Sequence, residues 1–537
     1  MDCWKKLKET LSTEPFWHSL QGDRNPAVLG ERVFTTHAFE RLFEMIDRLG
    51  GKGADYPLST AVRFLMMMTL CHHTVLTWFA DQLLTDAPIR ALVLGDPKRL
   101  RSERAKAGTP PEQTHISKYV HQYMPLLLAK LEAFYYEMVR LYLAKYPELR
   151  FGLCFDASKT DTNGHPERST YSTDPETGER KKVGTKPATD KDAATWVMNI
   201  HNPSGLNGKA ARESDERPTR VKRGFGFHLG HIRPAKKGPP LVFDFSPPKK
   251  GNGERAVVVR LVEKMLTIFP ELRLNGELAV FIADAGLESK RLTAFLMDLG
   301  YTLVVPVKRT LAAKLLKHER FITRGEVLRV RRDGVPACKQ GPLKVLASDL
   351  GIQKASRFRC PMTSLGECPT PCKLEPVHDA FGRLKHPIVK RSIRRLTPEE
   401  RFRFPLFPRR GKQFWWLFKL RSANERDYSY FKGRGQFEGL LITGEDNHAL
   451  RFMCMLIVLT ALALLKDGIE LPAEIVDAAW PTAAALQVGI TLDGPDVEFD
   501  EDEEEDELEN REEDELESAR ADSSSDDEPE GDTGKAR

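Results

Sequence analysis

Three carboxylates in separate segments are the residues of this sequence best suited to chemistry. Asp156 ends a short apolar segment that begins at Phe151, and Asp284 ends another that begins at Leu278. Glu438 lies further along the chain, in a segment predicted to be helical. If the two apolar segments are neighbouring strands, both aspartates emerge at one edge of a sheet. Carboxylates that converge repel one another unless cations lie between them, and hard cations such as Mg²⁺ or Mn²⁺ suit oxygen ligands.

Two such ions about 3.5–4 Å apart can hold both the attacking and the leaving oxygen of an in-line displacement at phosphorus. One ion activates water or a 3′-hydroxyl, and the other stabilises the departing oxygen. The sequence therefore predicts a two-metal site, formed by Asp156, Asp284 and Glu438, that cleaves and transfers phosphodiesters. Each acid taken singly is better explained as a solvated strand end or helix face.

The pattern of apolar residues predicts the elements that position these carboxylates. Residues 30–150 show the spacing of amphipathic helices, with Pro125 as a candidate break in the longest of them. From Arg150 onward the period changes to that of short buried strands separated by helices. We expect an α/β fold in which a three-stranded meander and two helix–strand crossovers form a mixed sheet flanked by helices. Strands are predicted over residues 151–156, 195–201, 224–232, 278–284 and 302–307, helices over 256–268 and 288–299, and a long polar loop over 161–191.

The charge of the chain is distributed very unevenly. Residues 493–537 contain 23 Asp and Glu against 4 Lys and Arg, and the rest of the chain contains 77 Lys and Arg against 54 Asp and Glu. A basic body favours a polyanionic partner, most often nucleic acid, although solubility alone would also explain it. The acidic tail can bury almost nothing and is predicted to be disordered. It either competes with DNA for the basic surface or is simply solvated.

The composition excludes several classes of protein. With 41% apolar and 29% charged residues, the chain is typical of a soluble globular protein rather than a disordered or collagen-like one. The longest apolar run, Phe452–Leu465, has 14 residues, fewer than the ~20 that span a bilayer. The first 21 residues contain no apolar signal-peptide core. Eight cysteines in 537 residues favour a reducing, cytoplasmic compartment. Because the apolar run is short, we expect no membrane partner.

The segments that contain the three carboxylates resemble the three carboxylate motifs of DDE transposases of bacterial insertion sequences. The similar segments are Cys154-Phe-Asp156-Ala, Phe281-Ile-Ala-Asp284-Ala-Gly-Leu-Glu288 and Arg434-Gly-Gln-Phe-Glu438. Residues 224–229 and 300–308 resemble the third and fifth strands of that family. The resemblance implies an RNase H-like catalytic core with an insertion after the fifth strand.

The same resemblance implies an activity and its partners. The enzyme would use Mg²⁺ or Mn²⁺, two ions at a time, to cleave at the ends of the element and release 3′-hydroxyls. Those hydroxyls would attack target DNA by direct displacement. The expected partners are double-stranded DNA, namely the element's terminal inverted repeats and the target, and a second copy of the chain in the DNA complex. The expected location is the cytoplasm, in association with the nucleoid.

One subgroup of that family has a Tyr-x₂-Arg-x₃-Glu-x₆-Lys signature on the last catalytic helix. Arg434 and Glu438 match it, whereas Phe431 takes the Tyr position and Glu445 the Lys position. Arg434 shares a helical face with Glu438, so it either contacts a DNA phosphate or forms a salt bridge that orients the acid. The expected DNA contacts are Arg434, Lys432, Lys308, Tyr430, His228 and Trp415.

Two of these contacts have an alternative explanation. Trp415 and Trp416 lie among lysines and could stack on an unpaired base. Adjacent residues on a strand point in opposite directions, so one of the two is expected in the core. His228 and His231 lie on the predicted third strand, where they could touch DNA or a metal-bound water or could be structural.

Three cysteines and one histidine cluster within the basic segment 310–430. Their spacing, Cys360-x₇-Cys368-x₃-Cys372-x₅-His378, allows a structural Zn²⁺ site, with Cys338 as an alternative fourth ligand. The x₇ spacing is wider than usual, and free thiols in a loose loop are the other explanation.

The expected organisation follows from these segments. A helical N-terminal region, residues 1–148, would bind the DNA ends. The RNase H-like core would begin at 149–309, be interrupted by an insertion at 310–425, and be completed at 426–470 by the last catalytic helix and a buried helix. A linker at 471–492 and the acidic tail at 493–537 would follow. The alternative functions are a nuclease that cuts without joining, and a decayed or repurposed DNA-binding protein of the same fold.

Overall fold

The computed structural model describes most of residues 25–489 and none from 490 to 537. The acidic tail therefore lies outside the described residues. The described ranges are 25–50, 55–73, 76–161, 168–173, 180–186, 194–199, 221–235, 238–246, 254–272, 279–307, 315–323, 326–338, 341–348, 355–359, 377–378, 384–385, 388–392, 405–433 and 444–489, with residues 4, 8, 11 and 350.

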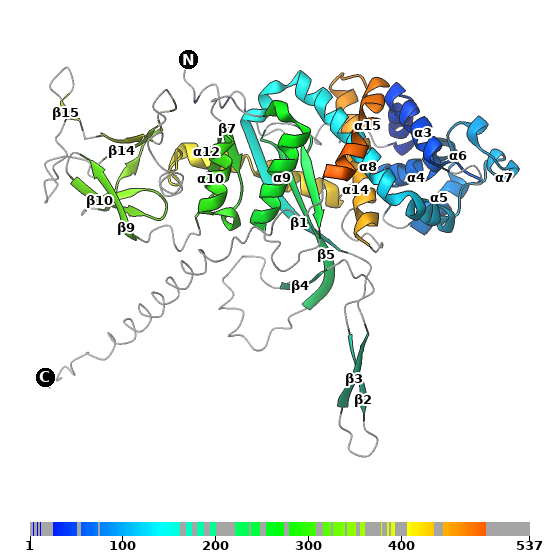
Figure 1. Cartoon of the computed structure of the whole chain (residues 1–537), viewed down its shortest axis with the longest axis horizontal. Helices are drawn as coiled ribbons and strands as arrows, with labels where there is room; N and C mark the ends of the chain where they lie inside the picture. Colours follow the sequence, from blue (N-terminus) through cyan, green and yellow to red (C-terminus); the bar gives the residue numbers. More distant parts are fainter. Residues whose placement is uncertain are drawn as a thin grey trace, which may run out of the picture. The chain divides into compact units, whose positions relative to one another are not determined.

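A six-stranded mixed sheet lies at the centre of the described chain (Figure 1). Its order is β4-β5-β1-β7-β8, and β6 also pairs with β5. The neighbours of β1 differ in direction, because β5 runs antiparallel to it and β7 runs parallel. The predicted mixed sheet is therefore confirmed. The strands are β1 (Gly152–Asp161), β4 (Ala194–Asn199), β5 (Val221–Pro234), β6 (Val242–Ser246), β7 (Ala279–Ile282) and β8 (Tyr301–Val304).

The predicted meander is wrong, because β5 and not β4 lies beside β1. The 14-residue β5 is long enough to pair with β1 along one edge and with β4 and then β6 along the other. The predicted loop over 161–191 contains an antiparallel hairpin of β2 (Arg168–Thr173) and β3 (Arg180–Lys186). Pairing between segments far apart in the sequence, which local patterns do not encode, decides the first difference. The hairpin is local, but its strands are polar and carry no apolar alternation.

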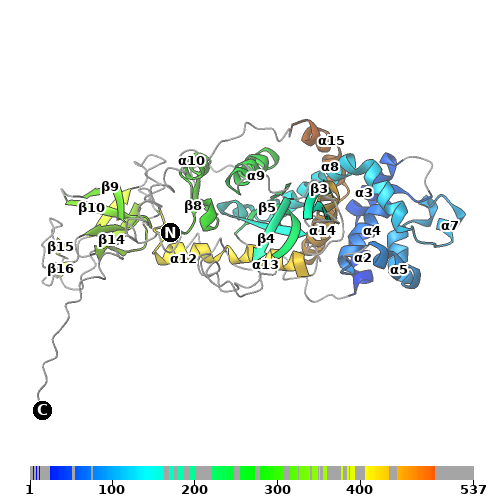
Figure 2. The ribbon, with the colours of Figure 1, turned by 90° about the horizontal axis from the view of Figure 1, so that it is seen from below.

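Alternating side chains give the sheet two buried faces. Leu153, Phe155 and Phe281 point into a large core shared with the helices α9 and α14. Cys154 and Ile282 point the other way, into a smaller core shared with α12. Figure 2 shows α9 and α10 on one side of the strands and α12 and α13 on the other. These helices are α9 (Glu254–Ile268), α10 (Lys290–Asp298), α12 (Lys412–Lys419), α13 (Ser422–Gly433) and α14 (Glu445–Lys466).

The N-terminal region is helical, as predicted. Side-chain caps begin several of its helices, for example Thr36, whose hydroxyl accepts a hydrogen bond from the N–H of Phe39. Pro125 lies inside one continuous 33-residue helix and does not split it. The helices are α2 (Pro26–Phe34), α3 (His37–Leu49), α4 (Leu58–Leu70), α5 (Leu76–Thr85), α6 (Ala87–Leu94), α7 (Glu103–Lys106) and α8 (Gln113–Lys145).

α14 joins this helical region to the sheet. It packs against α8, α4 and β6. By length and composition it could cross a membrane, the one helix of the described chain that could, but 94% of its most apolar stretch is buried within the protein. That packing is typical of a core helix. α15 (Glu474–Gly489) follows and packs against α8 and α3.

Small sheets occupy the segment between β8 and α12. β9 to β12 form a four-stranded sheet, and β13, β14 and β17 form a three-stranded one. Arg409 attaches this segment to the core, because its guanidinium lies 3.2 Å from the Glu288 carboxylate and donates to the carbonyls of Val305 and Arg332. The strands are β9 (Leu315–Thr323), β10 (Glu326–Arg331), β11 (Pro336–Cys338), β12 (Gly341–Pro342), β13 (Lys344–Val345), β14 (Ala355–Arg359), β15 (Val377–His378), β16 (Leu384–Lys385) and β17 (Ile388–Ser392).

A buried ion pair holds α13 against the sheet. Arg233 of β5 pairs with Asp427 of α13, and the two side chains are 0% and 1% exposed. The guanidinium of Arg233 also donates to the carbonyl of Pro234. Since Arg233 lies opposite Cys154 in the β1–β5 register, the pair fixes where α13 crosses β1.

The substitution Asp427→Asn should lower the free energy of unfolding by about 3–5 kcal/mol, because it leaves the buried Arg233 guanidinium without its carboxylate. Glu425→Gln on the same helix is the control, since it breaks a pair whose carboxylate is 56% exposed and should cost about 1 kcal/mol or less. Chemical denaturation measures both. Equal losses in the two variants would show that the buried pair does not hold α13 in place.

Candidate active site

The strand register brings two of the predicted carboxylates together. β1 and β7 are parallel neighbours, with Cys154 beside Ile282. Asp156 follows Cys154 by two residues, and Asp284 follows Ile282 by two residues. The two aspartates therefore lie at the same level of the sheet, where β7 ends. The expectation that Asp156 ends its strand is wrong, because pairing with β5 extends β1 to Asp161. This arrangement can present two carboxylates to one ligand.

Asp156 lies in a poorly solvated position. Its side chain is 13% exposed, and its Oδ1 accepts a hydrogen bond from the N–H of Ala157. Burial raises the pKa of Asp156 from its ordinary 3.8 to about 6. The nearby guanidinium of Arg421 lowers this pKa, and the negative charges of Asp284 and Glu425 raise it. A carboxylate in this position is stabilised by added positive charge.

Asp284 is fixed by the turn that follows β7. Its Oδ1 accepts a hydrogen bond from the N–H of Gly286, which caps the short 3₁₀ helix η5 (Ala285–Leu287). Ser289 then caps α10, where its hydroxyl accepts from the N–H of Leu292. The neighbouring Glu288 is 9% exposed and pairs with Arg409. Glu288 is therefore a structural acid, and Asp284 is the one at the sheet edge.

α13 and the residue before it place a third carboxylate beside Asp156. Nη1 of Arg421 lies 3.4 Å from Oδ1 of Asp156, and Nη2 lies 2.6 Å from Oε1 of Glu425. One helical turn further on, the hydroxyl of Tyr428 donates to the main-chain carbonyl of Asp156 at 3.1 Å. Arg421, Glu425 and Tyr428 are spaced i, i+4 and i+7, so they share the face of the helix that meets β1.

The sequence analysis did not identify Glu425, although a signal was present. The Tyr-x₂-Arg-x₃-Glu-x₆-Lys signature is matched a second time, from Phe418 through Arg421 and Glu425 to Lys432. Three of its four positions agree, against two for the alignment that starts at Phe431. A search that required the final lysine would have selected the alignment that starts at Phe418. Arg434 and Glu438 lie in residues 434–443, outside the described residues.

The remaining predicted DNA contacts are spread over the chain. Trp415 is 47% exposed and lies on the helix α12, so the expectation of a strand there is wrong. Trp416 packs against the smaller core. Tyr430 is partly buried on α13. His228 lies on β5 and Lys432 on α13, with side chains outside the description, and Lys308 lies outside the described residues.

His231 lies opposite Asp156 in the β1–β5 register. Its ring is fully buried, with a centroid 4.5 Å from that of Tyr428. Burial, together with the charge of Arg233, lowers the pKa of His231 to about 3, so the ring is neutral. A ring with no exposed surface fits the structural explanation for this histidine.

The fit of these residues to metal ions differs between the two predicted sites. Within the described ranges, no three ligating side chains lie close enough to hold a metal ion. At the sheet edge the carboxylate oxygens of Asp156 and Glu425 are ligands that suit Mg²⁺. In this structure the guanidinium of Arg421 lies between them. Of the proposed zinc ligands, Cys360, Cys368 and Cys372 lie outside the described residues, and the side chain of His378 is not described, so that site stays a prediction.

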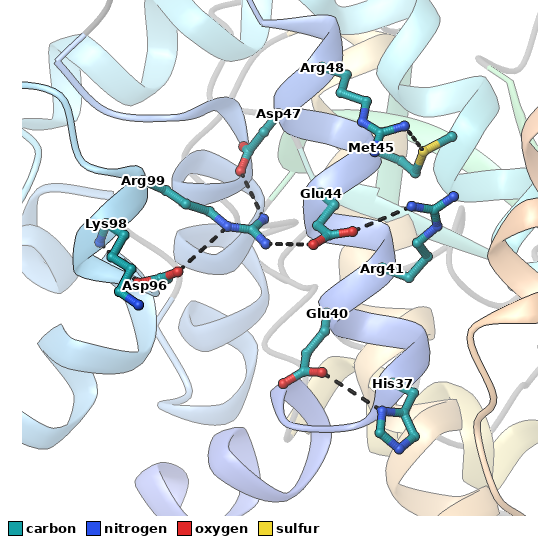
Figure 3. Close-up of polar contacts among 10 residues, drawn as sticks. All are labelled: His37, Glu40, Arg41, Glu44, Met45, Asp47, Arg48, Asp96, Lys98 and Arg99. Carbon is teal, nitrogen blue, oxygen red and sulfur yellow. Dashed lines mark hydrogen bonds and ion pairs between the residues drawn. The ribbon is translucent and has the colours of Figure 1, made fainter.

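A cavity of about 530 Å³ lies in the N-terminal region, on residues of α3, α4 and α6. Arg99 lies beside it, 2.9 Å from Glu44 and 3.5 Å from Asp47 (Figure 3). Because its carboxylates outnumber its cations, this cavity does not suit a DNA phosphate. The predicted DNA-end binding by residues 1–148 stays a prediction. The charged lining residues are Glu40, Glu44, Arg63, Asp96 and Arg99.

No protein-family model matches this sequence, and no curated protein matches it. The chain is similar to a chain of the piggyBac transposase synaptic complex with hairpin DNA, at 7% identity and a TM-score of 0.32, over 90% of this chain and 84% of that one. It is also similar to a chain of the pre-cleavage Mos1 transpososome, at 10% identity and a TM-score of 0.16, over 52% and 78%. TM-scores this low establish neither a shared fold nor a shared function.

The substitution Asp156→Asn should stabilise the metal-free protein at about pH 8. Because the pKa of Asp156 is raised to about 6 by folding, the wild type loses stability as the pH rises from about 4 through about 6. The variant has no such loss, so its free energy of unfolding should exceed that of the wild type by about 2–3 kcal/mol at pH 8. Below about pH 4 the carboxyl of Asp156 is protonated in both states of the wild type, so this difference should disappear. Urea titrations at several pH values measure it. A gain equal to that of Asp298→Asn, on the exposed face of α10, would contradict the burial of Asp156.

Proposed function

We propose that this protein is a DNA transposase of the DDE type, which cuts at the ends of an insertion sequence and joins them to target DNA. The observation that carries the proposal is the β1–β7 register, in which Asp156 and Asp284 each follow the last paired residues, Cys154 and Ile282, by two positions. The position of Glu425 on α13 supports it further. The strand order supports an RNase H-like core, because antiparallel strands lie on one side of β1 and parallel strands on the other.

Asp156, Asp284 and Glu425 are the residues we propose for holding Mg²⁺ or Mn²⁺, and Glu438 is the other candidate for the third acid. Bound ions would supply an activated water or 3′-hydroxyl and would stabilise the oxygen that leaves phosphorus. The protein's own part is positional. The capping bond to Gly286 holds Asp284, and the hydroxyl of Tyr428 fixes the main chain at Asp156.

The basic body supports DNA as the substrate. Lys412, Trp415 and Lys419 are all exposed and are spaced along one face of α12, just before Arg421. Lysines on such a face would contact phosphates, so binding should weaken steeply with salt. We propose double-stranded DNA, as element ends and target, as the partner and a homodimer as the assembled form. The nucleoid is the proposed location.

Cleavage of linear DNA that contains the gene's own flanks tests the proposal. With Mg²⁺ or Mn²⁺ the wild type should cut at the flanks and join the released ends to a second duplex. Asp156→Asn and Asp284→Asn should slow cutting by about three orders of magnitude or more, because each removes a metal ligand. Asp298→Asn is the matched control. Comparing Glu425→Gln with Glu438→Gln identifies the third acid, since the one whose loss stops cutting is the ligand.

Three results would overturn parts of this proposal. Cuts without joined products would indicate a nuclease of the same fold. Binding without any cut in either metal would indicate a DNA-binding protein without catalysis. Cutting that survives Asp284→Asn would remove the carboxylates from the mechanism altogether.

A further inference from the structure

Arg421 is the cation that already lies between the carboxylates of the candidate site. Its two terminal nitrogens lie 3.4 Å from Oδ1 of Asp156 and 2.6 Å from Oε1 of Glu425. Its guanidinium also lies 5.7 Å from the centre of the Phe418 ring. One side chain therefore balances two of the three acids proposed to hold metal ions.

Arg421 and a metal ion compete for the same oxygens. A divalent cation bound to Asp156 and Glu425 would lie within a few ångströms of the guanidinium, and like charges that close repel one another strongly in a poorly solvated site. Asp156 is 13% exposed, so solvent screens this repulsion only in part.

The side chain of Arg421 can move away from the carboxylates, whereas the buried side chain of Arg233 cannot leave its own partner. The Arg421 side chain is 20% exposed. It is held by its ion pairs with Asp156 and Glu425 and by its contact with the Phe418 ring, and the Glu425 side chain is 56% exposed. Arg233, by contrast, is 0% exposed and pairs with the buried Asp427. A phosphate group offers a guanidinium two parallel charge-assisted hydrogen bonds. Arg421 can therefore release Asp156 and Glu425 and bind a phosphate near the site in their place.

We propose that Arg421 couples metal binding to the substrate: it occupies the carboxylates until a nucleic-acid phosphate draws it away, and only then do they bind the cation well. The inference rests on the proposed function and adds a regulatory role to that site. Because coupling between two ligands is reciprocal, the metal should also strengthen the binding of DNA. The consequence is that the free protein holds its catalytic ions weakly.

Mn²⁺ binding, followed by the loss of the free-ion electron paramagnetic resonance signal, tests this without any catalysis. Without DNA, Arg421→Gln should bind Mn²⁺ about tenfold more tightly than the wild type, within the range of typical coupling. A short duplex, with its own Mn²⁺ binding subtracted, should strengthen Mn²⁺ binding in the wild type and have little effect in the variant. Lys290→Gln is the control, because it removes one exposed positive charge at the start of α10, six residues after Asp284, and should behave as the wild type.

Each other outcome has a distinct meaning. Equal Mn²⁺ affinities for the wild type and Arg421→Gln without DNA would overturn the proposal. So would an equal strengthening by DNA in both proteins. The same gain in Lys290→Gln would also overturn it, because it would reduce the effect to general electrostatics. If Asp156→Asn and the wild type bound Mn²⁺ alike under every condition, the metal site itself, and with it the proposed function, would fail.

Discussion

The buried ion pair between Arg233 and Asp427 is the interaction on which the candidate site depends. Neither side chain is exposed to solvent by more than 1%. A guanidinium and a carboxylate that deep in the protein stabilise each other only when paired, so α13 has one place to lie on the sheet. From that place Tyr428 reaches the main chain of Asp156 and Glu425 reaches the same guanidinium as Asp156. Removing the pair would change stability and site geometry together.

The second constraint is the balance of charge at the sheet edge. β7 ends beside the part of β1 that contains Asp156, so the fold brings two carboxylates together, and α13 adds a third. Burial is the main cause of the raised pKa of Asp156, and the negative charges of Asp284 and Glu425 raise this pKa further. Proteins tolerate this cost at functional sites, where the strain is relieved by a ligand. Arg421 supplies positive charge in the arrangement described, and a divalent ion would supply more.

Much of the fold could be predicted from the sequence, because it depends on local patterns. Apolar runs identified β1, β7 and β8, and helical spacing identified the N-terminal helices and α9 and α10. The patterns did not reveal β6 or the β2–β3 hairpin, whose segments are short or polar. They also placed Trp415 on a strand, whereas it lies in the helix α12. A short aromatic run suits either element, and packing against the core decides between them.

The sequence by itself determined that Asp156 and Asp284 follow the apolar runs of β1 and β7, because such a run depends only on neighbouring residues. It did not show that β1 continues to Asp161. It also determined the basic body and the acidic tail, which are matters of composition. The tertiary structure decided that β5, not β4, is the neighbour of β1, and that Glu425 lies beside Asp156. Those facts follow from contacts between residues far apart in the sequence, such as Arg421 and Asp156, which are 265 positions apart. Such contacts are selected by shape and by the pairing of buried charge, neither of which leaves a local mark on the chain.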